Sequence, residues 1–473
     1  MTPEKRERRD HAVVLGAGIA GLLAARVLSE SYESVTVVER DELSANATPR
    51  NGVRQGQHIH MFMSSGTEAL EQLFPGILGE LRAAGATVCD EGDLSRIRML
   101  IGSREMFNRS GKFNDRGTFK LYLATRPFLE SHVRQHVQLI DNVKFLDGHD
   151  VIEPMTEEFR VTGVRVARRS TGLVTTLIAD LVVDATGRSP RTQTFLDRLG
   201  CERPAEVRMA SPVTYASQLL HVSDDVDLDK LTFMNPAPGH PYGGAIARCE
   251  NGTVMMTLGR FNLDEPPTTF TEMISFAEQF VPTEVLDTIQ SAVTIGDMHT
   301  YRYREAVWRR YDQIRQFPQG LLVIGDAICS LDPIKGQGMT MALVEALTLR
   351  DSLMAGDSEL ARRYFDAVGR RIGAVWQQNK IAAPLFTATP ANASAAQRIA
   401  WSLTAWWTGK MMIAAREDIR ITETILRVSH LHDSPSLMRR PTFMLRVLRH
   451  SWRRHDTPVQ APRRQLAVSG PLS

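Results

Sequence analysis

Two glycine-rich segments, far apart in the chain, carry the residues whose types and spacing could do chemistry. The first is Gly16-x-Gly18-x-x-Gly21, which follows the apolar stretch HAVVL and leads into the helical pattern LLAARVL. In such a strand–turn–helix unit the first glycine permits the tight turn, the second lets a pyrophosphate approach the backbone, and the third lets helix and strand pack closely. The N-terminus of the helix supplies free N–H groups and a positive dipole. The motif predicts dinucleotide binding, and a purely structural turn is the alternative.

An acidic residue follows this motif at the distance typical of a ribose-binding carboxylate. Glu39 ends the β-branched stretch SVTVV, about twenty residues after the glycines, and can accept hydrogen bonds from the adenosine ribose hydroxyls. An acid here favours an unphosphorylated ribose, which means FAD or NAD rather than NADP. The neighbouring Arg40 is also predicted to lie at the cofactor.

The second glycine-rich segment distinguishes FAD from NAD. Leu321–Asp326 is an apolar stretch that ends in Gly-Asp, and a later segment with Pro333, Gly336, Gly338 and Met339 opens a helix. An aspartate at a strand end can hold a sugar-alcohol hydroxyl, and N–H groups at a helix start can face the negative charge of a reduced flavin near N1 and O2. An ordinary turn with a capping aspartate is the alternative. Together the two motifs predict FAD, bound at its diphosphate by one segment and at its ring by the other.

These motifs, with DATGR at Asp184–Arg188, resemble the group A flavoprotein monooxygenases of the para-hydroxybenzoate hydroxylase type, over roughly residues 10 to 350. The resemblance implies an FAD-dependent monooxygenase that consumes O₂ and transfers oxygen from a flavin C4a-hydroperoxide. It implies that Asp326 contacts the FAD ribitol and that Pro333 lies beside the isoalloxazine. It also implies that Gly338 and Met339 offer backbone groups to the pyrimidine edge of the ring.

The same resemblance implies further cofactor contacts. Arg126, in TRPFLESHV, matches a helix position near the FAD, and Arg54 and Gln57, in VRQGQHIH, lie where the family's loop approaches it. The family's middle motif usually carries an Asp-Gly pair that is linked to both FAD and NAD(P)H, whereas this chain has Thr186-Gly187 there. Gly187 still offers backbone groups to the FAD. We therefore expect electrons to come either from NADPH directly or from a separate flavin reductase.

Two other stretches indicate the class of substrate. GVRQGQHIHMFMSSGTEALEQLFPG and LHDSPSLMRRPTFMLRVLRH resemble the bacterial epoxidase-like branch that acts on polyketide and terpenoid chains. This resemblance implies hydroxylation or epoxidation of a lipophilic secondary metabolite, with antibiotic biosynthesis as one setting. An FAD-bound cyclase that closes a polyene by [4+2] addition without redox turnover is the alternative. A flavin reductase or dehydrogenase acting on isoprenoids is a third hypothesis.

The sequence assigns no catalytic side chain, and it offers three candidates. His58 and His60 would lie on one face of an extended segment toward the flavin, where they could position substrate or cofactor. Ordinary hydrogen-bonded histidines are the alternative, and no third ligand nearby in sequence makes them a metal pair. Pro333 is the third candidate because of its place beside the ring.

The strands and helices expected to position these residues indicate an α/β chain with three folded parts and a tail. A discontinuous Rossmann-type FAD-binding domain is expected from 10–75, 120–200 and 300–360, with an inserted mixed or antiparallel β-sheet as substrate domain from 76–119 and 201–299. A C-terminal helical segment covers 361–455 and a disordered tail 456–473. Within these parts, Ser64–Phe74 and Leu123–Ile140 are predicted to be helices. The substrate is expected between the inserted sheet and the flavin ring.

The amino-acid composition limits the kinds of molecule and surface that the protein is expected to bind. The 473 residues are 43% apolar with a formal net charge of +2, which favours an ordinary globular enzyme over a nucleic-acid binder. The four cysteines form no C-x-x-C pair and are interpreted as reduced thiols of a cytoplasmic protein. No apolar run is long enough for a transmembrane segment. The aromatic stretch Trp401–Ile413 is interpreted as helix core, or alternatively as a contact for a lipophilic substrate, an acyl carrier protein or a membrane surface.

Overall fold

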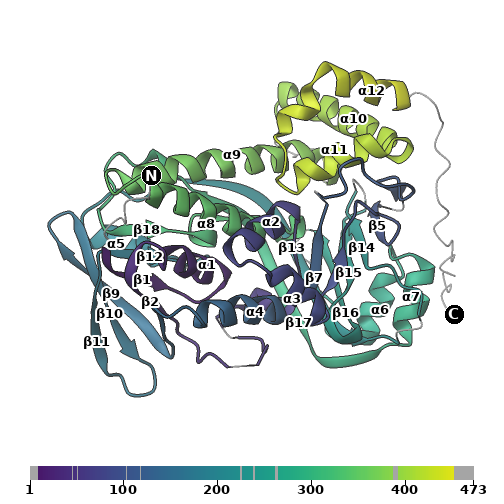
Figure 1. Cartoon of the computed structure of the whole chain (residues 1–473). Helices are drawn as coiled ribbons and strands as arrows, with labels where there is room; N and C mark the ends of the chain where they lie inside the picture. Colours follow the sequence, from purple (N-terminus) through teal and green to yellow (C-terminus); the bar gives the residue numbers. More distant parts are fainter. Residues whose placement is uncertain are drawn as a thin grey trace, which may run out of the picture.

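The computed structural model describes residues 9–44, 46–50, 52–102, 104–117, 119–223, 226–237, 240–261, 265–386 and 393–451. The predicted tail at 456–473 lies outside these residues. Figure 1 shows a Rossmann part, a second sheet beside it, and a group of helices that packs over the second sheet. The fold is α/β, as the motifs predicted.

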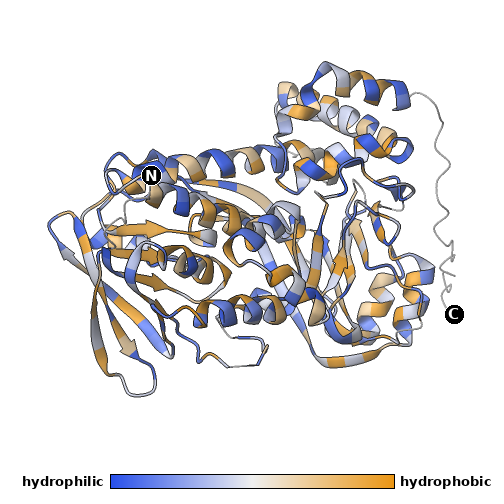
Figure 2. Ribbon diagram, viewed as in Figure 1, coloured by the Kyte–Doolittle hydropathy of each residue, from blue (hydrophilic) through white to orange (hydrophobic). Residues whose placement is uncertain are grey.

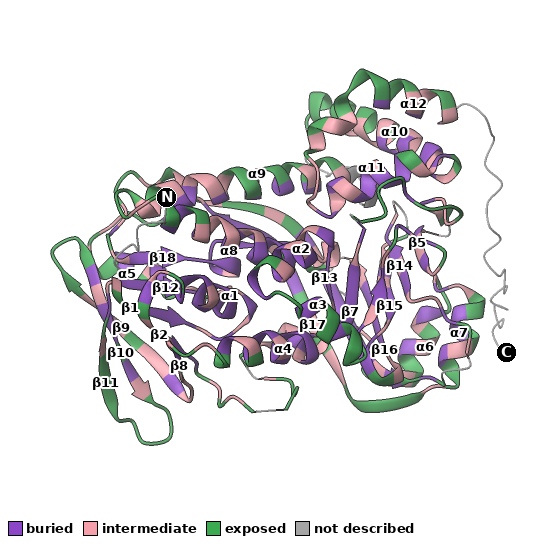
Figure 3. Ribbon diagram, in the orientation of Figure 1, coloured by how far each residue is buried: buried purple, intermediate pink, exposed green. Residues whose placement is uncertain are grey.

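A parallel sheet forms the centre of the Rossmann part. Its five strands have the order β18-β12-β1-β2-β8, and every neighbouring pair is parallel. The strands are β1 (Arg9–Leu15), β2 (Tyr32–Val38), β8 (Val143–Leu146), β12 (Leu181–Asp184) and β18 (Leu321–Val323). They consist mainly of β-branched and aliphatic residues because both faces of the sheet are covered. Figure 2 shows these strands as mostly hydrophobic, and Figure 3 shows them as mostly buried.

Helices cover one face of the parallel sheet and a small antiparallel sheet covers the other. Helix α1 (Ile19–Leu28) packs between α4 (Arg126–Gln138) and α8 (Gly338–Met354). The opposite face meets the three-stranded sheet of β9 (His149–Glu157), β10 (Arg160–Arg168) and β11 (Val174–Ile178). The short helix α5 (Thr192–Arg198) follows β12. Helix α8 therefore brings the second glycine-rich segment next to the first strand–helix unit, as one shared FAD site requires.

The second sheet is mixed, in agreement with the predicted inserted sheet. Its eight strands have the order β19-β17-β13-β16-β15-β14-β5-β6, with β14 and β5 parallel and the other pairs antiparallel. The strands are β5 (Ile97–Ile101), β6 (Arg104–Glu105), β13 (Glu206–His221), β14 (Leu231–Asn235), β15 (Tyr242–Arg248), β16 (Thr253–Phe261), β17 (Val293–Arg309) and β19 (Cys329–Ser330). Helices α6 (Phe270–Ala277) and α7 (Thr283–Gln290) pack on one face of this mixed sheet. The proposed domain border at 299/300 falls inside β17.

A small third sheet lies where the Rossmann part meets the mixed sheet. It has the order β3-β7-β4, from β3 (Ile59–Phe62), β7 (Leu121–Thr125) and β4 (Thr87–Cys89), and is joined by α2 (Ser64–Leu73) and α3 (Ile77–Ala83). Strand β3 contacts α8 on one side and β15 and β16 on the other. The predicted helix Leu123–Ile140 is wrong at its start. Thr125 caps α4 by accepting from the Phe128 N–H, and the preceding residues pair with β3 instead.

The C-terminal helices pack against both parts. Helix α9 (Leu360–Phe386) lies on α8, whereas α10 (Ala395–Glu417), α11 (Ile419–Ser429) and α12 (Pro441–Ser451) form the group at the top of Figure 1. Within Trp401–Ile413, Met411 is buried in the core beneath the mixed sheet's outer strands, while Leu403 and Trp406 are exposed. In the described residues no helix is both long and apolar enough to span a membrane.

Candidate active site

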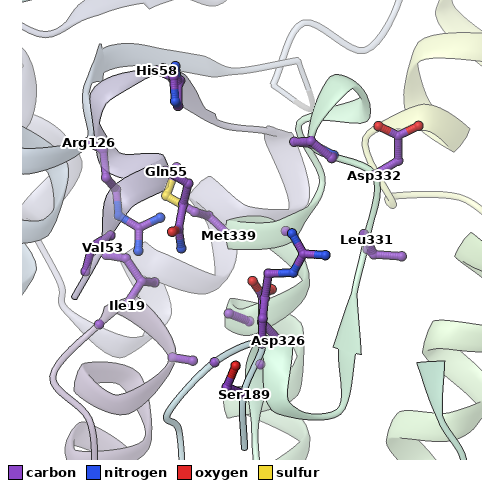
Figure 4. A pocket seen from close by; sticks show the side chains of 18 of the residues that line it. Ile19, Val53, Gln55, His58, Arg126, Ser189, Asp326, Leu331, Asp332 and Met339 are labelled. Carbon is purple, nitrogen blue, oxygen red and sulfur yellow. The ribbon is translucent and has the colours of Figure 1, made fainter. Parts of the chain in front are cut away.

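A cavity of about 1220 Å³ lies between the Rossmann part and the mixed sheet. Its walls come from the loops after β1, β2, β12 and β18, from the segment before and within β3, from the start of α8, and from β13, β15 and β16. This is the carboxyl edge of the parallel strands, where ligands of such sheets bind. Figure 4 shows residues from these separate segments pointing into one space, among them Gln55, His58, Arg126 and Asp326.

The first glycine motif forms the end of the cavity at the N-terminus of α1. Gly16 has φ +102°, and a Cβ on it would lie 2.8 Å from the Ala185 carbonyl oxygen. A Cβ on Gly21 would lie 1.8 Å from the Gly16 carbonyl oxygen, so this glycine lets helix and strand pack closely. Gly18 differs, since a Cβ there would meet nothing within 4 Å, and Gly18 lines the cavity. The open space therefore lies directly against the start of the helix.

Glu39 stands beside this space at the end of β2. Its carboxylate accepts from the Ala17 N–H at 2.7 Å and from the Asp41 N–H at 3.0 Å, and it pairs with Arg50 at 3.1 Å. A carboxylate has about four acceptor positions, so capacity is left for a ribose hydroxyl. Arg40 is exposed and lines the rim, 3.8 Å from Asp150.

A buried chain of charges continues from Glu39 across the site. Arg50 forms an ion pair with Glu130 and donates to the Ala17 carbonyl oxygen at 3.0 Å. Glu130 in turn accepts from Arg126, at 3.2 Å and one helical turn earlier in α4. Burial works against the charge of Arg50, but Glu130 and Glu39 outweigh it and raise the pKa of this guanidinium. These contacts hold Arg126 in the wall of the cavity.

The loops after β12 and β18 form the other end of the cavity. Burial raises the pKa of Asp326, against the opposing effect of Arg188. Arg309, at the end of β17, donates to the backbone oxygens of Asp326 at 3.3 Å and Arg188 at 3.0 Å. Glu345 of α8 accepts from the Gly325 N–H at 2.6 Å. Arg309 thus joins the two loops to each other, and Glu345 fixes the loop after β18 to α8.

The cavity fits FAD at both ends. Like Gly18, Gly187 and Gly338 line it and have nothing within 4 Å of where a Cβ would lie. Three loops thus present bare backbone to the same space, which is the arrangement that a diphosphate and a flavin ring require. Asp184, in contrast, is fully buried and accepts from the backbone and side chains of Thr186 and Thr192. It stabilises the loop and does not line the cavity.

The side of the cavity formed by the mixed sheet is largely apolar and aromatic. Its walls include Val213, Tyr215, Phe233, Met234 and Phe261. Three polar side chains on this side form a short hydrogen-bonded chain. In it, His58 Nδ1 lies 2.7 Å from the Ser217 hydroxyl, which lies 2.6 Å from the Thr257 hydroxyl. Burial lowers the pKa of His58 to about 3, so the ring is neutral at pH 7. This side suits an apolar ligand with a small uncharged polar group.

Most of the residues predicted from the sequence meet around this one cavity. Those that line it are Gly16, Gly18, Glu39, Arg40, His58, His60, Arg126, Gly187, Asp326, Pro333, Gly336, Gly338 and Met339. Gly21 packs behind it, and Gln57 does not line it, whereas Gln55 does. Arg54 belongs to the 3-10 turn Arg54–Gln57, but its side chain lies outside the described part. Their roles toward FAD stay predictions.

Sequence reasoning missed several residues of the site. They are Arg50, Glu130, Ser217, Thr257 and Arg309. Glu130 carried a usable signal, because Arg126 and Glu130 have the i, i+4 spacing of a helical ion pair. The described residues contain no cluster of three side chains that could hold a metal ion.

Sequence comparisons identify the relatives of this chain. A family model for FAD dependent oxidoreductases matches residues 11–153. Protein Rv3254 of Mycobacterium tuberculosis (strain ATCC 25618 / H37Rv) is 32% identical over 476 residues, which is 96% of each chain. The kynurenine 3-monooxygenase of Salinispora arenicola (strain CNS-205) is 27% identical, over 74% of this chain and 73% of that protein.

Solved structures share the fold at lower identity. The flavin-dependent brominase Bmp2 has a TM-score of 0.65 at 15% identity, over 93% of this chain and 98% of its own. The p-nitrophenol 4-monooxygenase PnpA from Pseudomonas putida DLL-E4 has 0.63 at 16%, over 90% and 99%. The Diels-Alderase PyrE3 of pyrroindomycin biosynthesis has 0.61 at 16%, over 90% and 81%. The chain belongs to the same family as Protein Rv3254, and it is an FAD-dependent oxidoreductase with the fold of flavin-dependent monooxygenases.

Proposed function

We propose that this protein is a monooxygenase that hydroxylates or epoxidises a lipophilic secondary metabolite of the polyketide or terpenoid kind. The observation that carries the proposal is the continuity of the cavity. The same space runs from the glycines of the dinucleotide motif to the apolar face of the mixed sheet. A substrate bound against that face would lie next to the ring end of the cofactor, where an oxygen atom is transferred.

Bound FAD supplies the redox and oxygen-activating chemistry, and the chain supplies binding, orientation and exclusion of water. Asp326 and Glu39 are proposed to hold the ribitol and the ribose of the cofactor. Val213, Phe233 and Phe261 are proposed to hold the apolar body of the substrate, since they line the far wall. No side chain of the chain has to act as a nucleophile in this proposal.

The source of electrons is part of the proposal. Thr186 occupies the position of the usual aspartate, and its hydroxyl donates to Asp184 at 2.6 Å while accepting from the Arg191 N–H at 3.3 Å. The residue is therefore engaged within its own loop. We propose that a flavin reductase or NADPH itself delivers the electrons, and stopped-flow reduction by NADPH with and without a reductase distinguishes the two.

The oxygen atom itself provides the test of function. The FAD-loaded protein is incubated with ¹⁸O₂, a reductant and a panel of unsaturated polyketides and terpenoids, and products are examined by mass spectrometry. The proposal predicts a product that carries one ¹⁸O atom and forms only under aerobic, reducing conditions. Label from H₂¹⁸O in its place would refute oxygen transfer.

A second candidate is a cyclase that keeps FAD without redox turnover. Similarity to the Diels-Alderase PyrE3 and the Thr186-Gly187 pair favour it. Such an enzyme would convert a polyene under anaerobic conditions with oxidised flavin, and its product would have the mass of the substrate. The same panel run without O₂ and without reductant therefore separates the two functions.

A further inference from the structure

Two histidines of the cavity wall lie two residues apart in sequence. Each makes a hydrogen bond within the protein through one of its two ring nitrogens. His58 ends the 3-10 turn before β3, and His60 lies within β3. Both line the cavity, and in both the hydrogen bond within the chain is made by Nδ1. Their Nε2 atoms are neither bonded within the described chain nor among its buried unpaired atoms. Each Nε2 thus has accessible surface, and the cavity is the space that both rings line.

The hydrogen-bond partner of His60 determines which of its two ring nitrogens carries the hydrogen. Its Nδ1 lies 2.9 Å from the backbone carbonyl oxygen of His58, and a carbonyl oxygen only accepts. Nδ1 must therefore carry the hydrogen, because two facing lone pairs would repel. In a neutral ring the other nitrogen then has a free lone pair. His60 presents a hydrogen-bond acceptor, Nε2, to the cavity.

The partners of His58 lead to the opposite arrangement. The Thr257 hydroxyl oxygen accepts from the Ile59 N–H at 3.3 Å, and its hydrogen has one acceptor within the described chain, the Ser217 oxygen at 2.6 Å. Ser217 then donates its own hydrogen to Nδ1 of His58, at 2.7 Å. In the reverse direction the Thr257 hydrogen would have no acceptor within the described chain and would have to donate into the cavity, which Thr257 also lines. Nδ1 of His58 thus accepts, and its Nε2–H donates into the cavity.

Both rings are held and both are neutral. His58 packs edge-on against Tyr215 and Tyr301, with ring centroids 4.7 and 5.7 Å apart. Burial lowers the pKa of both histidines to about 3, with further lowering by His299 for His58 and by Arg126 for His60. Neither ring accepts a proton at pH 7, so the two differ only in which nitrogen donates.

We propose that His58 and His60 form a neutral recognition pair in which the Nε2–H of His58 donates and the Nε2 of His60 accepts. The pair takes an uncharged group that has an acceptor next to a donor, such as a carboxamide or the hydroxyl and carbonyl of an enolised ketone. The inference rests on the proposed function only in that the substrate occupies this cavity. His58 lies against Ser217 and Tyr215 of β13, on the mixed-sheet side of the cavity, and His60, two residues later, is influenced by both His58 and Arg126.

The proton positions are tested directly by neutron diffraction from crystals of the deuterated, FAD-loaded protein at pH 7. A deuteron on Nε2 of His58 and on Nδ1 of His60 is the expected result. The same tautomer on both rings, or a doubly protonated ring, would overturn the proposal. This outcome does not depend on whether the protein oxygenates a substrate, so failure of the proposed function is distinguishable from failure here.

The ligand preference is tested with two probes of nearly equal shape, 2-naphthamide and 2-naphthoate. The amide offers an acceptor and a donor, whereas the carboxylate offers only acceptors and a charge. Binding to the FAD-loaded protein is followed by the change in flavin absorbance. The pair predicts that the amide binds about tenfold more tightly than the carboxylate. A carboxylate that binds as tightly as the amide, or an amide that binds no better than naphthalene, would refute it.

Matched variants assign the effect to the two rings. In His58→Asn and His60→Asn the shorter amide reaches the Nδ1 partner but nothing stands where Nε2 was, so each variant should bind 2-naphthamide about three- to tenfold more weakly. His58→Gln returns an N–H near the Nε2 position and should regain part of that affinity. Variants that lose FAD affinity while keeping the preference for the amide would show that the pair serves the cofactor and would overturn the proposal.

Discussion

Gly18 and Gly21 belong to one motif, yet the structure predicts different effects when each gains a side chain. A side chain at Gly18 should impair FAD binding, and one at Gly21 should lower the stability of the fold. Gly18 has φ −74° and ψ 177°, ordinary values for any residue, and a Cβ there meets nothing within 4 Å. A Cβ on Gly21 would lie 1.8 Å from the Gly16 carbonyl oxygen, which is backbone and cannot move aside. We expect Gly18→Val to fold and lose FAD, and Gly21→Ala to lose stability.

The magnitudes follow from what each side chain displaces. A valine at Gly18 fills the space at the helix start and removes at least one charge-assisted hydrogen bond to the diphosphate, worth about 1.5–3 kcal/mol. This corresponds to FAD binding that is about 10- to 150-fold weaker. For Gly21→Ala the overlap is an overpacking of the core, which lowers the free energy of unfolding by about 1–3 kcal/mol or more.

The assay uses apoprotein, so that stability and cofactor affinity are read separately. Thermal unfolding is measured without FAD, and affinity is measured by quenching of flavin fluorescence on titration. Gly18→Val should unfold at the wild-type temperature and Gly21→Ala several degrees lower. Wild-type FAD affinity in Gly18→Val, or equal destabilisation of both apoproteins, would refute the reasoning.

Three further predictions concern the ring end of the site. Burial raises the pKa of Glu345 from 4.5 to about 8. Between pH 4.5 and 8 the folded state therefore keeps a proton that the unfolded state has lost. The free energy of unfolding must fall as the pH rises through this range, by at most about 5 kcal/mol. Glu345→Gln keeps the acceptor for Gly325 and should flatten the dependence of apoprotein unfolding on pH between 5 and 8; an unchanged slope contradicts it. Arg309→Met removes the bonds that join the loops after β12 and β18 and should weaken FAD binding about tenfold by fluorescence titration. Asp326→Ala should weaken it by about 1–3 kcal/mol through the lost ribitol bond, and wild-type affinity would exclude that contact.

The predictable part of the fold is the part in which local sequence determines local geometry. The strand, the glycines and the helix of the first motif are adjacent, so their spacing alone identified the open glycine and the packed one. Helix α2 was predicted at Ser64–Phe74 and found at Ser64–Leu73. The error at Leu123 has the same origin, because an apolar alternation before a capping threonine and Pro127 suits a strand or a helix until its partner β3 is known.

Contacts between distant segments account for what the sequence did not reveal. Arg50 and Glu130 are 80 residues apart, and they meet in a fold in which β3, after Arg50, pairs with β7, the strand that leads directly into α4. The sequence predicted Gln57 at the cofactor loop, whereas Gln55 lines the cavity, since a tight turn rotates neighbouring side chains to different sides. No local pattern distinguishes Gln55 from Gln57.

Polar contacts join the Rossmann part and the mixed sheet at two places. β17 is the longest strand of the mixed sheet. Its last residue, Arg309, donates to the loop after β12 and to the loop after β18. On the opposite side of the cavity, His58 bonds to Ser217 of β13, the strand that pairs with β17 along most of its length. The mixed sheet is therefore bonded through β17 to the loops after β12 and β18, and through β13 to the residue just before β3. Because β13 and β17 are paired along most of their length, we expect a displacement of one strand to carry the other, so that His58 and the loop at Asp326 move together.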